Sequence, residues 1–241
     1  IVKDKPMKSN PLVSIVIAVY NEEKDLPAVI EAFLKQSYKK TEIIIIENNN
    51  STDKTYPIAK DYAKKYKKIK AYSIKGKQRG PGNAWNFGIE KSKGKIIVIG
   101  VGDMLCEEDY IKKGIIPILK GETVGVMHKE ELCANPDKIW ARAFFLKRSS
   151  TQHGNTWKMF HIIRKDYVLK RLFDPKLGYG DDTTIFRKEG TEFLVTDIKT
   201  RHINPSNLKD TWTHGVWSGA SNEKPWIIIF GLPTFPIFAL H

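Results

Sequence analysis

Carboxylate and amide side chains follow two apolar runs near the start of the chain. Residues 20–23, Tyr-Asn-Glu-Glu, come directly after the apolar run at 12–19, and residues 47–53, Glu-Asn-Asn-Asn-Ser-Thr-Asp, follow a second run. Such side chains can hydrogen-bond the base edge and the ribose hydroxyls of a nucleotide. They are also good turn residues, and Ser51, Thr52 and Asp53 would cap a helix wherever they occurred.

Glycines and cations follow a third apolar run, and a single carboxylate follows a fourth. Residues 75–83 read Lys-Gly-Lys-Gln-Arg-Gly-Pro-Gly-Asn, a composition that lets backbone amides, Lys77 and Arg79 approach phosphate ahead of a helix N-terminus. Gly-Pro-Gly is also a common turn sequence in loops that have no binding role. Asp103, after the fourth run, can hold a divalent metal ion. A structural role, as the cap of a helix expected at 107–119, is the alternative.

The elements that position these residues alternate along the chain. Strands are expected at 12–19, 43–46, 69–74 and 96–99, and helices at 26–34, 53–66, 83–91 and 107–119. Such alternation predicts an α/β fold with a parallel sheet and helices on both faces. Because ligands bind outside the carboxyl ends of parallel strands, the four polar loops are expected to form one nucleotide-diphosphate cleft.

The rest of the chain has a different organisation. Residues 1–10 are expected to be a lead-in segment, and the strand–helix rhythm of residues 11–128 ends at His128. Residues 129–222 have clustered aromatic side chains and no clean repeat, which favours an α+β half built onto the edge of the sheet. In the last segment, 223–241, residues 226–240 have no charge. They are shorter than the roughly 20 residues of a membrane-spanning helix. An interfacial segment, the start of a membrane region, and a core-covering element all remain open.

Composition limits the class of protein. With 241 residues, 41% of them hydrophobic, the chain is long enough for a globular domain and is not of the disordered type. Its 40 Lys and Arg against 27 Asp and Glu give +13, a charge that attracts nucleotide phosphates, nucleic acid or an anionic membrane. Cys106 and Cys133 are too far apart for a C-x-x-C motif, which excludes a disulfide scaffold and favours the cytoplasm. The start of the sequence has no signal-peptide pattern.

Three segments together resemble the opening motifs of family 2 glycosyltransferases with the GT-A fold. They are residues 14–22 (Ser-Ile-Val-Ile-Ala-Val-Tyr-Asn-Glu), 45–53 (Ile-Ile-Glu-Asn-Asn-Asn-Ser-Thr-Asp) and 79–88 (Arg-Gly-Pro-Gly-Asn-Ala-Trp-Asn-Phe-Gly). The resemblance extends over residues 11 to about 220. It implies a Rossmann-like nucleotide-sugar-binding half at 11–128 and an acceptor-binding half at 129–222. It also implies inverting transfer from a UDP- or GDP-linked sugar, assisted by Mg²⁺ or Mn²⁺.

The resemblance assigns nucleotide-binding positions residue by residue. The residues that line the base and ribose site are Ala18, Tyr20 and Glu22. Asn48 or Asn49 replaces an Asp that contacts the base in the family. The residues near the diphosphate or ribose are Lys77, Arg79 and Asn83. The family commonly has Arg where this chain has Trp85, and Arg79 is the candidate substitute.

The metal motif of the family, Asp-x-Asp, is reduced here to Val101, Gly102 and Asp103. The second Asp is the usual metal ligand in the family, so the resemblance implies that Asp103 still binds a metal ion. His202 matches a position that completes the metal shell in some relatives. A lone histidine is also often structural.

A second pair of carboxylates resembles the Gly-x-x-Glu-Asp motif of the family. It lies in residues 178–183, Gly-Tyr-Gly-Asp-Asp-Thr, where Asp182 matches the catalytic base and Asp181 its acidic neighbour. Such a base removes the proton of the acceptor hydroxyl as the new bond forms. Two acids are also favourable at a helix N-terminus. With an already ionised lipid phosphate as acceptor, Asp182 would orient the acceptor instead.

Residues 213–217, Thr-His-Gly-Val-Trp, keep only the Trp of the Gln-x-x-Arg-Trp motif of processive synthases, which favours addition of a single sugar. We therefore expect a non-processive glycosyltransferase that acts on a lipid-linked or glycan acceptor at the cytoplasmic face of a membrane. A sugar-phosphate nucleotidyltransferase is an alternative, but its usual Gly-rich loop after the first strand is absent. A basic nucleic-acid-binding module is another. Its lysines are scattered, however, and no RRM, KH or zinc-finger signature is present.

Overall fold

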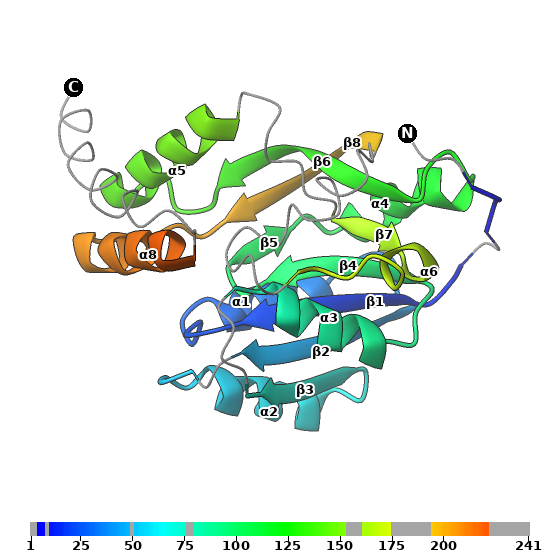
Figure 1. The fold of residues 1–241 in the computed structure, drawn as a ribbon, viewed down its shortest axis with the longest axis horizontal. Coiled ribbons are helices and arrows are strands. Elements are labelled where there is room, and N and C mark those ends of the chain that lie inside the picture. Colours follow the sequence, from blue (N-terminus) through cyan, green and yellow to red (C-terminus); the bar gives the residue numbers. More distant parts are fainter. Residues whose placement is uncertain are drawn as a thin grey trace.

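The computed structural model describes residues 4–7, 10–48, 51–75, 80–152, 161–174 and 194–221 (Figure 1). Strands and helices alternate through the first half of the chain, as the sequence predicts. The elements, in chain order, are β1 (Val13–Val19), α1 (Leu26–Leu34), β2 (Thr41–Asn48), α2 (Thr55–Lys65), β3 (Ile69–Ile74), α3 (Gly82–Lys91), β4 (Ile96–Val101), β5 (Met104–Cys106), α4 (Tyr110–Leu119), β6 (Gly125–Cys133), α5 (Ile139–Gln152), β7 (Ile162–Arg164), α6 (Lys165–Val168), β8 (Leu194–His202) and α8 (Leu208–Ser221).

The strands form one mixed sheet in the order β3-β2-β1-β4-β7-β6-β8-β5. β1 is parallel to β2 and β4, β2 is parallel to β3, and β6 is parallel to β8. β7 is antiparallel to both β4 and β6, and β5 is antiparallel to β8. Consequently β6 and β8 run in the same direction as β1–β4, and the carboxyl ends of all these strands lie at one edge of the sheet. The fold is α/β, as predicted.

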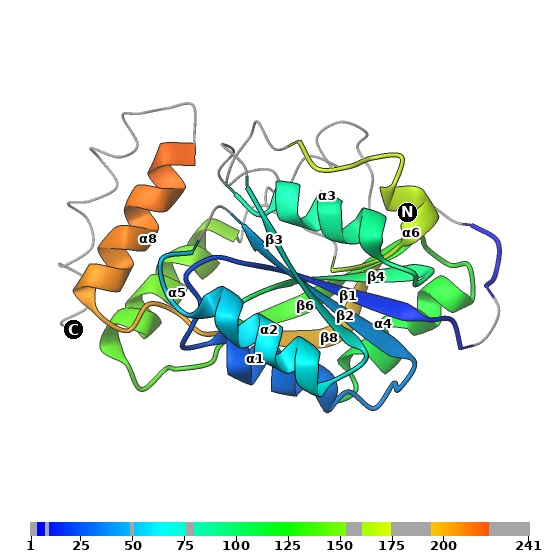
Figure 2. The ribbon, with the colours of Figure 1, turned by 90° about the horizontal axis from the view of Figure 1, so that it is seen from below.

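Helices cover both faces of the sheet. In Figure 2, α3 and α6 lie on one face, and α1, α2 and α4 lie on the other. Successive residues of a strand point to opposite faces, so a strand covered on both sides must be apolar throughout. In β1, Ile15 and Ile17 pack into one core, while Val16 and Ala18 pack into the other. This arrangement explains the uninterrupted apolar runs in the sequence.

Several boundaries differ from the predicted ones. β4 extends to Val101 because Val101 pairs with Ala18 of β1. α4 begins at Tyr110, with Asp109 at the N-cap, rather than at residue 107. The short strand β5 was not predicted, since its three residues are too few to show a period.

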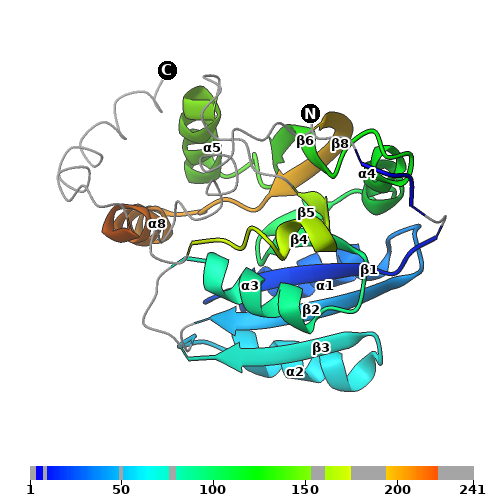
Figure 3. The same ribbon diagram turned by 45° about the vertical axis from the view of Figure 1, so that its right-hand side comes forward.

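The second half of the chain continues the same sheet. β6 spans the predicted boundary between residues 128 and 129. α5 and α8 lie beyond the carboxyl ends of β1 and β4 (Figures 1 and 3). Within the described ranges, no helix has the length and apolar character needed to cross a bilayer. The apolar segment expected at 223–241 lies outside these ranges.

Candidate active site

The loops after β1 and β2 are joined by hydrogen bonds. Asn21 adopts a positive φ of 55°, a conformation that asparagine tolerates better than most residues. Its backbone N–H donates to Ser51 Oγ at 3.0 Å, and its side-chain Oδ1 accepts from the backbone N–H of Thr52 at 2.8 Å. The two loops therefore form one unit at the carboxyl edge of the sheet.

The Asp53 carboxylate strengthens this connection. It accepts hydrogen bonds from the backbone N–H of Glu23 at 3.1 Å and of Thr55 at 2.9 Å. Burial acts to raise the pKa of Asp53, but the hydrogen bonds from Thr55 and Glu23 outweigh it and hold that pKa below its usual value. Asp53 thus holds the two loops together at the start of α2.

Asn48, the last residue of β2, connects this unit to the start of α3. Its side chain is 5% exposed, and its Nδ2 donates to the carbonyl of Gly80 at 2.7 Å. Its Oδ1 is buried and accepts no hydrogen bond from any of the described residues. A buried amide oxygen of this kind suits a ligand that presents an N–H group.

Trp85 has a structural role in α3. It is 1% exposed, its Nε1 donates to the carbonyl of Gly100 at 2.9 Å, and its ring lies 4.9 Å from that of Phe173. The family commonly has a cation at this position, whereas here the side chain anchors α3 on β4. In this chain the position belongs to the core.

Glu22 packs directly against the turn that carries Asp103. A Cβ atom on Gly102 would lie only 2.5 Å from Glu22 Cγ, so a side chain at position 102 would displace Glu22 or the turn. Burial, followed by the charges of Asp103, Asp25 and Asp53, raises the pKa of Glu22 well above its usual value. Burial and then Asp103 also raise the pKa of Asp25. A cation at this edge would relieve the repulsion among these carboxylates.

Asp103 and His202 meet across two paired strands. Met104 of β5 pairs with His202 of β8, and the backbone N–H of Ile203 donates to the carbonyl of Asp103 at 2.9 Å. As a result, Asp103 Oδ2 lies 3.5 Å from His202 Nδ1. The alternative role of Asp103 as the cap of the following helix is wrong, because Asp109 occupies the N-cap of α4.

The separation of these two atoms fits a shared divalent cation. Two ligand atoms that each lie about 2.1 Å from one ion are about 3 to 3.5 Å apart when they subtend about 90–110° at it. A carboxylate oxygen and an imidazole nitrogen are both suitable ligands for Mn²⁺. Among the described residues, no group of three or more His, Cys, Asp or Glu side chains is placed to hold a metal ion. Phosphate oxygens of a nucleotide and water can supply further ligands.

Most of the predicted site residues that the structure describes lie at the carboxyl edge of the sheet. Ala18 is buried in β1 between Ile46 and Val101. The others at or just beyond strand ends, or in the first turn of α3, are Tyr20, Glu22, Asn48, Asn83, Asp103 and His202. The predicted residues outside the described ranges are Asn49, Lys77, Arg79, Asp181 and Asp182.

Sequence reasoning missed Glu131 and His128 of β6. Glu131 Oε1 lies 3.7 Å from His202 Nε2, and Glu131 Oε2 lies 3.7 Å from His128 Nε2. The pairing of β6 with β8 creates these contacts, and no local motif indicates that pairing.

The family sequence model "Glycosyl transferase family 2" matches residues 14–188, which is more than half of the chain. The chain belongs to this family. This membership is what the sequence resemblance implied. It favours sugar transfer over the nucleotidyltransferase and nucleic-acid-binding alternatives.

Curated relatives of this family 2 glycosyltransferase include proteins from bacteria and archaea. "Uncharacterized glycosyltransferase RP339" of Rickettsia prowazekii is 42% identical over 215 residues, covering 81% of this chain and 64% of the relative. A Methanococcus voltae protein named dolichyl N-acetyl-alpha-D-glucosaminyl phosphate 3-beta-D-2,3-diacetamido-2,3-dideoxy-beta-D-glucuronosyltransferase is 33% identical over 205 residues, covering 81% and 60%. "Probable glycosyltransferase YdaM" of Bacillus subtilis is 28% identical over 199 residues, covering 78% and 47%. The chain thus spans only about half to two thirds of the length of these relatives.

Solved structures show the same fold at low sequence identity. Staphylococcus aureus TarS 1-349 in complex with UDP-GlcNAc has a TM-score of 0.62 at 13% identity, covering 90% of this chain and 69% of that one. The mannosyltransferase PcManGT from Pyrobaculum calidifontis, in complex with GDP-Man and Mn²⁺, has a TM-score of 0.62 at 17% identity, covering 90% and 63%. Glucosyl-3-phosphoglycerate synthase from Mycobacterium tuberculosis, in complex with Mn²⁺, UDP and phosphoglyceric acid, has a TM-score of 0.57 at 16% identity, covering 89% and 79%. The family 2 chain therefore has the GT-A fold.

Proposed function

We propose that the protein transfers a single sugar, with inversion, from a UDP- or GDP-linked donor to a glycan or lipid-linked acceptor. The observation that carries the proposal is the pairing of Asp103 with His202 at the sheet edge where Glu22 and Asn48 also lie. The GT-A structures with UDP-GlcNAc, or with Mn²⁺ and either GDP-Man or UDP, support a similar donor here.

Different residues of the donor site would contact the base and the diphosphate. Asn48 Oδ1, buried at the end of β2, would accept a hydrogen bond from an N–H group of the base. The other residues assigned to the base and ribose are Ala18, Tyr20, Glu22 and Asn49. Those assigned to the diphosphate or ribose are Lys77, Arg79 and Asn83. Cations and backbone amides ahead of α3 would attract the diphosphate, since a helix N-terminus favours anions.

Asp103 and His202 would hold a divalent cation, Mg²⁺ or Mn²⁺, against the donor diphosphate. Such an ion neutralises the negative charge that develops on the leaving nucleoside diphosphate. The cation would also stabilise the ionised forms of Glu22 and Asp25. Burial and the charge of Asp103 disfavour both of these carboxylates.

The transfer step places the acceptor on the side opposite the leaving group. The acceptor hydroxyl oxygen attacks the anomeric carbon, the bond from that carbon to the diphosphate oxygen breaks, and Asp182 takes the hydroxyl proton. Asp181 is its acidic neighbour. With a phosphate acceptor there is no proton to remove, and Asp182 would orient the phosphate.

A peripheral contact with the cytoplasmic face of an anionic membrane would bring a lipid-linked acceptor to the site. The net charge of +13 supports this contact. So do four large apolar side chains that α5 and α8 expose: Ile139, Leu146, Leu208 and Trp212. The name of the Methanococcus relative also refers to a lipid-linked sugar, a dolichyl sugar phosphate. Sedimentation with anionic and neutral vesicles tests the contact, and equal binding to both, or to neither, would contradict it.

Product analysis tests the reaction. The protein is incubated with a panel of UDP- and GDP-sugars, Mn²⁺ and lipid-linked or glycan acceptors, and the nucleotide product is separated by chromatography. Sugar transfer releases free nucleoside diphosphate and forms a glycosidic bond with inverted configuration. A nucleotidyltransferase would instead release pyrophosphate. In a thermal unfolding experiment, nucleotide sugars should stabilise the protein. If oligonucleotides stabilise it and nucleotide sugars do not, the proposal is contradicted.

A further inference from the structure

A line of acidic and imidazole side chains extends from Asp103 into the protein. Behind the Asp103–His202 contact, Glu131 lies between His202 and His128, 3.7 Å from each. The rings of His128 and His161 are 3.8 Å apart, centroid to centroid. The side chains of His202, Glu131 and His128 are only 8–10% exposed. Glu131, His128 and His161 have no role in the mechanism proposed above.

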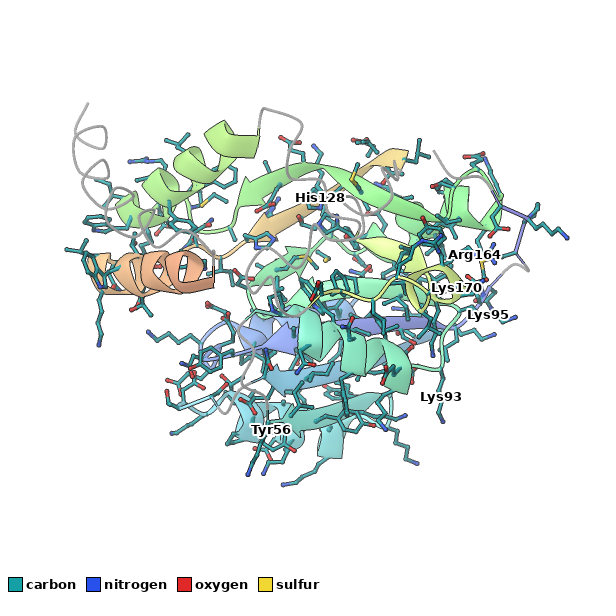
Figure 4. The ribbon with its side chains drawn as sticks, in the orientation of Figure 1. Tyr56, Lys93, Lys95, His128, Arg164 and Lys170 are labelled. Atoms are coloured by element: carbon teal, nitrogen blue, oxygen red, sulfur yellow. The ribbon has the colours of Figure 1, made fainter. Side chains whose placement is uncertain are left out.

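The pairing of β6 with β8 builds this line. Cys133 pairs with His202, and Glu131, two residues earlier in β6, faces the same side of the sheet. His128 is three residues from Glu131 and would face the other side in a regular strand. The β6–β8 ladder is irregular at this point, because its register shifts between His128 and Glu130, and His128 Nε2 lies 3.7 Å from Glu131 Oε2. Figure 4 labels His128 near the middle of β6.

We propose that Glu131 is a positioning residue for the cation site, which orients His202 so that its Nδ1 faces Asp103 and the metal ion. This inference rests on the proposed function, because it concerns the cation that Asp103 and His202 would hold. It goes beyond that function by assigning a role to a residue outside the family motifs discussed above.

The two nitrogens of His202 have different neighbours. Nδ1 lies 3.5 Å from Asp103 Oδ2, and Nε2 lies 3.7 Å from Glu131 Oε1. At this distance Glu131 acts through its charge rather than through a hydrogen bond. A neutral imidazole that gives its Nδ1 lone pair to a metal ion shared with Asp103 has its N–H on Nε2. Glu131, on the Nε2 side, is placed to orient the ring so that Nδ1 faces that ion.

His128 supports Glu131 from the opposite side. It contacts the second carboxylate oxygen of Glu131, and its own Nδ1 lies 3.5 Å from Thr200 Oγ1. A metal-binding histidine whose other nitrogen faces a carboxylate is a recurring arrangement, and loss of the carboxylate typically weakens metal binding about 10- to 100-fold. The same loss is expected here.

The test compares two adjacent glutamates of one strand. Glu131→Gln removes the charge beside His202, and Glu130→Gln is the matched control, because Glu130 is 48% exposed and pairs with Lys199 at 3.1 Å. Mn²⁺ affinity is measured by electron paramagnetic resonance in the presence of UDP or GDP, whichever the wild-type protein binds. We expect about a 10-fold or greater loss for Glu131→Gln. For Glu130→Gln we expect a change of about twofold or less.

The Mn²⁺ complex also gives a spectroscopic signature of His202. Electron spin echo modulation from the imidazole ¹⁴N should be present in the wild-type protein and in Glu130→Gln, absent in His202→Gln and diminished in Glu131→Gln. Glu131→Asp, which restores the charge, should recover part of both the affinity and the ¹⁴N signal. If Glu131→Gln does not fold, His128→Gln replaces it and should lower both quantities by a smaller factor.

Unchanged Mn²⁺ affinity in Glu131→Gln, or weakened affinity with the ¹⁴N signal intact, would overturn the positioning role alone. In either case the wild-type protein still binds Mn²⁺ through Asp103 and His202, and the proposed function stands. Failure of the wild-type protein itself to bind Mn²⁺ would instead overturn the cation site, and this inference with it.

Discussion

Asp103 Oδ2 lies 3.5 Å from His202 Nδ1, although the two residues come from opposite halves of the chain. The contact exists because β8 runs parallel to β6 and pairs with β5, the short strand directly after Asp103. In the sequence, the metal motif lacks its first Asp, at Val101. In the structure, His202 Nδ1 lies beside the remaining Asp of the motif, where it would be a second ligand atom in the proposed cation site.

Replacing Asp103 with Asn should selectively weaken Mn²⁺-dependent nucleotide binding. The change keeps the shape of the side chain but removes the charge that an ion would neutralise. A loss of about 10-fold or more in affinity is expected with Mn²⁺ present. Calorimetry with UDP or GDP, with and without Mn²⁺, measures it. Asp61→Asn is the control, because Asp61 is exposed and pairs only with Lys64 among the described residues. Equal losses in both variants would remove Asp103 from the site.

Asn48→Ala should weaken nucleotide binding to a similar extent with and without Mn²⁺. The variant loses the acceptor that would meet the base and also the hydrogen bond to Gly80, which holds the start of α3. One lost hydrogen bond of this kind corresponds to about 1 kcal/mol, or roughly fivefold in affinity. An effect seen only in the presence of Mn²⁺ would contradict the assignment of Asn48 to the base.

Glu22→Gln should raise stability at neutral pH in the absence of metal. The pKa of Glu22 is raised in the folded protein, so the unfolded chain loses its proton first as the pH rises. The wild-type protein therefore loses stability between the ordinary pKa of 4.5 and the higher folded pKa, whereas the variant does not. Thermal unfolding in EDTA across this window measures the difference, which should vanish at lower pH. If the stability difference between the variant and the wild-type protein does not depend on pH, burial and neighbouring charges do not disfavour the ionised form of Glu22.

Two neighbouring glycines of the β4 region should respond differently to alanine. At Gly102 the added Cβ would lie 2.5 Å from Glu22 Cγ, and at Gly100 it would lie 3.4 Å from Ile17 Cγ1. Gly102→Ala should therefore cost about 1–3 kcal/mol of stability and weaken Mn²⁺ binding, because Glu22 or the Asp103 turn must move. Gly100→Ala should cost less than about 1 kcal/mol. Chemical denaturation of both variants checks this contrast, and similar losses would argue against the close packing of Glu22 on Gly102.

Asp182→Asn should abolish turnover and leave donor binding intact. A general base typically contributes about 10²- to 10⁴-fold to a rate, so kcat should fall by at least about 100-fold. Calorimetry with the nucleotide sugar provides the control, since the donor affinity should not change. Full activity in Asp182→Asn with a hydroxyl acceptor would refute the assignment of the base.

The sequence alone predicts the first half of the fold well. Strands such as β1 and β2 are covered on both faces and must be apolar throughout, so their runs stand out, and loop composition locates the carboxyl edge. β5 and β7 have only three residues each and show no period. Their existence depends on pairing with distant strands, and no local pattern predicts such pairing.

The site shows the same division. Asn48 and Asp103 could be singled out because Asn48 ends a recognisable strand and Asp103 comes just after another, and His202 was found through the family resemblance. Glu131 could not be predicted, since its contact with His202 depends on the β6–β8 register and on the irregular ladder beside it. Trp85 occupies a position where the family has a cation, and only the structure shows that it packs in the core.

The most direct test of the account is an anomalous difference map at the manganese edge from crystals grown with Mn²⁺ and UDP or GDP. The expected result is a peak bonded to both Asp103 and His202 Nδ1 and in contact with the diphosphate, with the base beside Asn48. A nucleotide bound at another edge of the sheet, or a Mn²⁺ peak that touches neither Asp103 nor His202, would contradict it.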